Sequence, residues 1–111
     1  MSMVNVGMHT HLQAQPGKEK QLEEFLRAQE SFALGEPATT AWFVSKLGDN
    51  RFSIFHAFYD AAGLKAHVDG EICKSLFADV AHLLVESPKV ENLTILAAKL
   101  PDRAEFPDSL G

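Results

Sequence analysis

The sequence contains a single cysteine, Cys73, among its 111 residues. One cysteine excludes an intrachain disulfide and a thiolate metal cluster, and it fits a reducing compartment. Long apolar runs are missing as well, since segments such as residues 81–85 are far shorter than the roughly 20 residues that cross a bilayer. The N-terminus lacks a charged start followed by an apolar stretch, so we expect a cytoplasmic protein with no membrane partner.

Concentrated positive charge is also absent. The formal net charge is −5, and acidic and basic residues are interspersed along the chain, so we expect no nucleic-acid partner. The sequence has no Gly-x-Ser-x-Gly elbow, no phosphate-binding loop and no dinucleotide fingerprint, and its Pro16-Gly17-Lys18 segment is typical of a turn. Chemistry that needs ATP, nicotinamide or an acyl-enzyme therefore has no support.

The sequence does contain successive segments in which apolar residues recur with the regular spacing of a strand or a helix. Between Val4 and Gln13 the residues alternate between two faces, which is typical of a strand. After the turn at Pro16 and Gly17, apolar residues recur every three or four positions, which predicts a helix. The expected elements are, in order, strand 4–13, helix 18–34, strand 39–46, strand 51–59, a short helix to about residue 68, a longer helix that stops at Ser87-Pro88, and strand 90–100.

The element order β-α-β-β-α-β predicts an α+β fold of the ferredoxin-like, split βαβ type. We expect one such domain over residues 1–101, followed by a tail at 102–111 that is mobile or wraps a neighbouring subunit. Helices cover only one face of this kind of sheet. The other face mixes polar side chains with large aromatics, so we expect a second copy to cover it in a homodimer.

Several short phrases resemble the antibiotic-biosynthesis-monooxygenase family in order and register. They are Gln15-Pro16-Gly17-Lys18-Glu19, Glu36-Pro37, Ala41-Trp42-Phe43, Phe52-Ser53-Ile54-Phe55, Phe58-Tyr59-Asp60, Ala66-His67 and Lys99-Leu100-Pro101. The resemblance covers residues 4–101, and it implies a dimeric α+β barrel with a pocket between helices and sheet in each monomer. Family members of known activity oxidise phenolic or quinol-like molecules with molecular oxygen, without flavin, haem or metal.

A branch of the same superfamily degrades haem, and three of its marker positions differ here. The pocket tryptophan of that branch falls on His67, its haem-ligating histidine on Phe77, and its pocket asparagine on Thr10. An iron without its axial imidazole has no protein ligand at that position, so the resemblance argues against haem. We therefore expect no cofactor.

An oxygenase without a cofactor needs a base with a pKa near neutrality, donors for an oxyanion and apolar walls. His67 is our leading candidate for the base or proton relay, although a histidine near a helix C-terminus is also favoured by the helix dipole alone. His56 shares a strand face with Ile54 and Phe58 and is our second catalytic candidate, or a hydrogen-bonded core histidine. The expected substrate-binding residues are Trp42, Phe43, Phe55, Phe58 and, by its place in the resemblance, Thr10.

His9 and His11 place two imidazoles on one face of a strand, which is compatible with a metal. Two ligands do not make a site, and a third would have to come from Glu91, His56 or a partner subunit. For His9 and His11 we expect an interface or barrel-interior role, and we predict no metal.

For the whole protein we predict a monooxygenase for a small aromatic substrate and molecular oxygen. The alternative is a dimer of the same fold that binds a small ligand without chemistry. The sequence identifies neither the substrate nor which histidine points into the pocket.

Overall fold

The computed structural model describes residues 4–36, 39–69 and 71–100, with the backbone alone for residues 71–73, 75 and 76. The tail expected at 102–111 lies outside these residues. The elements are β1 (Val6–Gln13), α1 (Glu19–Ala28), α2 (Glu30–Leu34), β2 (Thr39–Lys46), β3 (Arg51–Phe58), α3 (Ala61–Asp69), α4 (Glu71–Val80), the 3₁₀ helix η1 (Ala81–Leu83) and β4 (Lys89–Thr94). In the described part of the chain, no helix has the length and apolarity to cross a bilayer.

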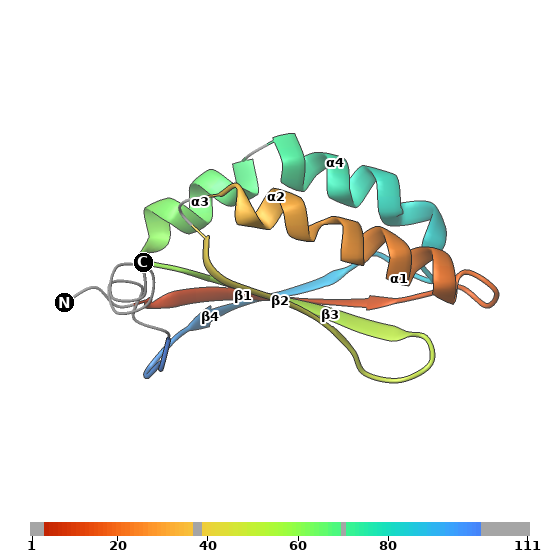
Figure 1. Cartoon of the computed structure of the whole chain (residues 1–111), viewed down its shortest axis with the longest axis horizontal. Helices are drawn as coiled ribbons and strands as arrows, with labels where there is room; N and C mark the ends of the chain where they lie inside the picture. Colours follow the sequence, from red (N-terminus) through yellow and green to blue (C-terminus); the bar gives the residue numbers. More distant parts are fainter. Residues whose placement is uncertain (1–3, 37–38, 70, 101–111) are drawn as a thin grey trace, which may run out of the picture.

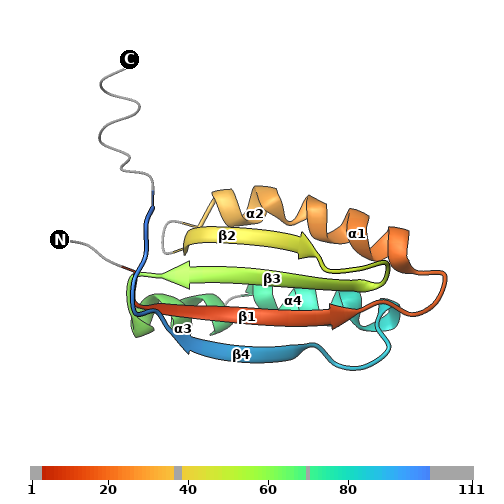
Figure 2. The ribbon, with the colours of Figure 1, turned by 90° about the horizontal axis from the view of Figure 1, so that it is seen from below.

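The four strands form one sheet in the order β2-β3-β1-β4, and every neighbouring pair is antiparallel. All helices lie over the same face of this sheet (Figure 1). Figure 2 looks onto the opposite face, which the helices leave uncovered. The predicted ferredoxin-like α+β fold is confirmed.

Two of the predicted boundaries were wrong. The helix expected at 18–34 is two helices, because a tightened turn at Gln29, whose N–H donates to the Leu26 carbonyl at 3.1 Å, separates α1 from α2. The last strand ends at Thr94 instead of residue 100. β4 pairs with β1, and β1 begins at Val6 directly opposite Thr94, so the ladder ends there.

The alternation of the strands divides their side chains between the two faces as predicted. In the register of β1 and β3, Met8 lies opposite His56, Thr10 opposite Ile54, and Leu12 opposite Phe52. All six side chains are buried beneath the helices. The intervening residues of both strands, His9 and Phe55 among them, belong to the open face.

The main core lies between α1, the end of α4 with η1, and the helix-covered face of the sheet. Leu22 and Leu26, four residues apart on α1, are fully buried because they form the apolar stripe of that helix. The remaining buried members of this cluster are Leu12, Ala14, Phe52, Ile54, Val80, Leu83 and Leu84. This packing holds α1 over β3 and leaves the other end of the sheet to α3, which contacts β1, β2 and β3.

Candidate functional site

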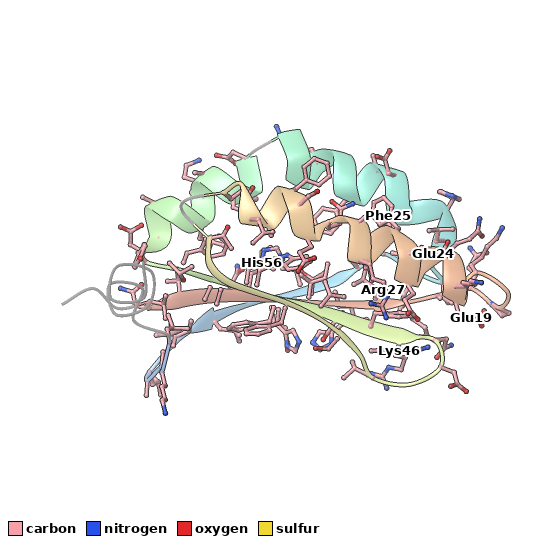
Figure 3. All side chains as sticks on the ribbon, in the orientation of Figure 1. Glu19, Glu24, Phe25, Arg27, Lys46 and His56 are labelled. Carbon is pink, nitrogen blue, oxygen red and sulfur yellow. The ribbon has the colours of Figure 1, made fainter. Side chains whose placement is uncertain are left out.

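His56 lies in the layer between the sheet and the helices (Figure 3). Its position on β3 puts its side chain on the helix-covered face, opposite Met8 on one side and Trp42 on the other. The residue is 3% exposed, so its imidazole is surrounded by protein. Burial, followed by the positive charge that His67 can carry, lowers the pKa of His56 to about 3. His56 is therefore neutral at physiological pH.

His67 comes to the same place from the last turn of α3. Its ring packs edge-on against the ring of His56 at a centroid distance of 4.7 Å, and it lies 5.4 Å from the ring of Phe58. Asp60 fixes the start of this helix, because its carboxylate accepts the Gly63 N–H at 2.9 Å. The two histidines that the sequence suggested as catalytic residues are thus in contact, although they come from different elements.

Glu36 completes this group. Its Oε1 lies 3.1 Å from Nδ1 of His67, whose side chain is only 9% exposed. A carboxylate can only accept when it is ionised, so it favours the tautomer of His67 that carries hydrogen on Nδ1. The second ring nitrogen, Nε2, is then left with a free lone pair. We call Glu36, His67 and His56 the histidine cluster.

Two nitrogens of the histidine cluster lack hydrogen-bond partners among the described residues. They are Nδ1 of His56 and Nε2 of His67, and both are buried. A buried polar atom without a partner costs roughly 1–3 kcal/mol, so such atoms in native proteins call for an explanation.

A groove of about 650 Å³ adjoins the cluster between α2 and the beginning of β2. Glu36 belongs both to its lining and to the ion pair with His67. Trp42 forms an aromatic part of the wall, and Tyr59 adds a phenol. This volume is within the range of small-molecule pockets, so the groove can hold an aromatic molecule of modest size beside the carboxylate.

A second, smaller cavity of about 370 Å³ lies between α1 and β2, and Trp42 also lines it. Its rim is charged: Glu23 binds Arg27 at 2.9 Å and Lys46 at 3.3 Å, which links the helix to the edge strand. Figure 3 shows Arg27 on the side of α1 that faces the sheet and Lys46 near the hairpin end of β2. Hydrogen bonds from both cations hold the pKa of Glu23 below its ordinary value. These exposed ion pairs position α1 and offer no buried group for chemistry.

The predicted substrate-binding residues fall into two groups on opposite faces of the sheet. Trp42, Phe58 and Thr10 lie on the helix-covered face, where Phe58 touches both histidines and Thr10 is 1% exposed. Phe43 and Phe55 lie on the open face, where their ring centroids are 6.4 Å apart. The structure does not bring Phe43 and Phe55 to the histidine cluster, because each occupies the alternate position of its strand.

Sequence reasoning missed Glu36 and underrated Tyr59. Both residues entered the sequence-based predictions only within the phrases Glu36-Pro37 and Phe58-Tyr59-Asp60, and neither of them was given a role. The ion pair between Glu36 and His67 spans 31 residues, so no local pattern could reveal it. The one available signal was the presence of a carboxylate immediately before the strand that carries Trp42.

The open face carries a different constellation, made of His9, His11 and Glu91. The three potential ligand atoms all lie within 4.8 Å of one another. Nε2 of His11 is 3.2 Å from Oε1 of Glu91, and Nδ1 of His9 is 4.0 Å from the same oxygen. Of the three possible sources of a third ligand, the structure supplies Glu91.

No protein-family model and no curated protein matches the chain. Solved structures do match. A protein of unknown function from Nitrosomonas europaea is 41% identical, with 92% of this chain and 99% of that chain covered and a TM-score of 0.86. The chain belongs to the family of this Nitrosomonas protein.

More distant matches include two proteins provisionally named antibiotic biosynthesis monooxygenases. The protein from Deinococcus radiodurans is 17% identical over 87% of this chain and 98% of its own, with a TM-score of 0.75. The protein from Caulobacter crescentus is 18% identical over 85% of this chain and 92% of its own, with a TM-score of 0.73. The resemblance to the fold of antibiotic biosynthesis monooxygenases is thereby confirmed, and the likeness at these identities concerns the fold alone.

Proposed function

We propose that this protein is a cofactor-independent monooxygenase that oxidises a phenolic or quinol-like small molecule with molecular oxygen. The observation that supports this most is the histidine cluster. A largely buried imidazole is paired with a carboxylate, and the same carboxylate lines a groove of about 650 Å³. The names of the distant structural matches agree with the proposal, while the family member from Nitrosomonas europaea has no stated function.

In the proposed mechanism, His67 acts as the base. Glu36 accepts the hydrogen on Nδ1, which leaves the lone pair of Nε2 free to take a proton from an acidic C–H or O–H of the substrate. The positive charge that forms on the ring is stabilised by the adjacent carboxylate. His56 stays neutral and offers Nδ1 as a further polar contact.

The electron-rich anion then reacts with oxygen. For a substrate with a CH₂ group between two aryl rings, the carbanion transfers an electron to O₂ and forms a C–O bond, which gives a hydroperoxide after protonation. Breakage of the O–O bond releases water and leaves a carbonyl group. One oxygen atom enters the product and the other leaves as water, so the substrate alone supplies the reducing electrons. A dry site favours this sequence because it excludes competing protonation by solvent.

Oxygen consumption tests the proposal. With anthrone or a naphthohydroquinone as substrate, the wild type should consume oxygen faster than the uncatalysed reaction, and His67→Ala should lose about 10²–10⁴-fold of that rate. Glu36→Gln should lose less, because an amide oxygen can still accept from Nδ1 but carries no charge. His82→Ala provides a matched control, since His82 is exposed on η1 and should leave the rate unchanged.

Tryptophan fluorescence separates this function from the alternative of a binding protein. Trp42 is the only tryptophan and lines the groove, so a bound aromatic molecule should quench its emission. The oxygenase would be rejected if the wild type showed quenching but consumed oxygen no faster than the uncatalysed reaction with both anthrone and the naphthohydroquinone. That result would favour ligand binding without chemistry.

We also propose that the open face of the sheet packs against the same face of a second copy. Helices cover one face only, and the open face presents Phe43 at 60% exposure next to Phe55. Aromatic side chains on an uncovered sheet face favour association with a partner surface. The two grooves would then lie on the outer sides of the pair, away from the contact.

A further inference from the structure

His9, His11 and Glu91 come together because of the strand register. His9 and His11 are two residues apart on β1, so both imidazoles project from the open face. Glu91 lies directly opposite His9 on β4, and its carboxylate extends toward both rings. The three residues lie on two hydrogen-bonded strands, which fixes the relative positions of their backbones before any ligand arrives.

The separations suit a small cation. With bonds of about 2.0–2.1 Å, a tetrahedral zinc ion places its ligand atoms about 3.3 Å apart. Nε2 of His11 and Oε1 of Glu91 are already 3.2 Å apart, and Nδ1 of His9 is 4.0 Å from the same oxygen. The three ligand atoms lie within 4.8 Å of one another, so the His9 side chain has to turn toward the other two ligands for all three to meet one ion.

A hydrogen bond between His11 and Glu91 does not by itself account for His9. The centroids of the two imidazoles are only 4.2 Å apart, and the planes are inclined by 52°. Two protonated rings at this distance would repel each other, whereas one divalent ion can bind two neutral rings at once. Lys89, the residue opposite His11, does not compete for Glu91, because its ammonium group binds Glu86 at 3.6 Å.

We propose that His9, His11 and Glu91 bind a divalent transition-metal ion, with Zn²⁺ as the best fit. Two imidazoles and one carboxylate are a donor set that prefers zinc and similar late first-row ions to Mg²⁺ or Ca²⁺. Three protein ligands leave the fourth position to water. The site lies on the open face, so the sheet separates it from the histidine cluster, and it is independent of the proposed oxygenase chemistry.

Metal content and calorimetry test this site on the full chain. The wild type, produced with zinc in the medium and exchanged into metal-free buffer, should retain about one Zn²⁺ per chain. After treatment with a chelator, titration with ZnCl₂ should show one saturable site, and MgCl₂ should give no binding. Loss of a ligand should raise the Kd at least about tenfold, the scale seen even for residues that only support metal ligands.

Two variants address the ligands separately. His11→Ala removes one imidazole, and Glu91→Gln keeps the shape of the side chain but removes its charge, so a loss of zinc in the second cannot be ascribed to misfolding. His82→Ala and His67→Ala should retain the metal, because neither residue belongs to the site. Replacement by Co²⁺ should give the intense visible absorption of a four-coordinate ion in the wild type and lose it in His11→Ala.

The proposal is overturned if the wild type neither retains zinc nor shows a saturable site. It is equally overturned if His11→Ala and Glu91→Gln bind zinc as tightly as the wild type, or if His67→Ala abolishes the binding.

Discussion

His56 is a buried titratable residue whose protonation the fold opposes. Burial and the charge of His67 lower its pKa to about 3, against 6.5 for an ordinary histidine. Between these two pH values the unfolded chain binds a proton that the folded chain rejects. The free energy of unfolding should therefore fall as the pH drops below 6.5, by up to about 1.4 kcal/mol per pH unit from this residue, and the decline should level off near pH 3.

Urea denaturation at pH 7, 6, 5 and 4 measures this dependence. Carboxylates also contribute to the slope, so the informative quantity is the difference between the wild type and His56→Phe, which keeps an aromatic ring among Phe58 and His67. The variant should show a shallower decline below pH 6.5, and His82→Ala should follow the wild type. Identical slopes for the wild type and His56→Phe would contradict the assignment of the buried neutral state.

At the level of single residues, strand periodicity predicted which residues share a sheet face with His9, His11 and His56, but not which groups the histidines meet. The alternation along β3 placed His56 beside Ile54 and Phe58, as found. The approach of His67 depends on how α3 packs over the sheet, and the pairing with Glu36 depends on a loop 31 residues away. Such contacts arise from tertiary packing, which has no local signature.

At the level of elements, β1 and β3 approach each other closely at Gly7. A β-carbon added there would lie 3.0 Å from the backbone oxygen of His56, and 3.3 Å and 3.4 Å from side-chain atoms of Ile95 and Phe55. The backbone oxygen cannot move without shifting β3, the strand that carries His56. Gly7→Ala should lower the free energy of unfolding by about 1–3 kcal/mol.

Gly48→Ala is the matched control for this prediction. Gly48 lies in the loop between β2 and β3, where an added β-carbon meets open space, so the free energy of unfolding should change by less than about 0.5 kcal/mol. Both values come from urea denaturation at pH 7. Equal stability of the two variants would show that the strands can separate at Gly7 without cost.

The type of each element could be predicted wherever the hydrophobic periodicity continued over many residues. β1 and β3 alternate over eight residues each, and their faces and pairing follow the sequence. Boundaries depended on neighbours: the end of β4 is set by the start of β1, and the break at Gln29 by a tightened turn that the apolar stripe does not reveal. The cluster of His9, His11 and Glu91 needed the register of β4, which the sequence alone did not give.

At the scale of the whole molecule, the sheet separates two sets of polar residues. The histidine cluster lies beneath the helices, and the proposed metal site lies on the opposite face of the sheet, the face that is seen in Figure 2. Under the proposed dimer, the metal sites of both copies would lie inside the pair and the grooves outside it. A metal in that position can support the association of the sheets, while substrate still enters each groove from solvent.

The proposed pairing of open faces predicts the effect of a charge at Phe43. This side chain is 60% exposed in the single chain, so Phe43→Arg should leave the fold intact. In a pair of facing sheets it would bury a guanidinium among aromatic side chains without a partner, which is costly. Light scattering should give twice the chain mass of 12.2 kDa for the wild type and the single mass for the variant.

Phe32→Arg distinguishes this contact from a general effect of charge. Phe32 is 48% exposed but lies on α2, on the helical side of the molecule, so its replacement should leave the dimer unchanged. A wild type of 12.2 kDa at working concentration would refute the dimer. A dimer that persists in Phe43→Arg but dissociates in Phe32→Arg would instead place the contact on the helices, and the open face with its histidines would then be free to bind metal from solvent.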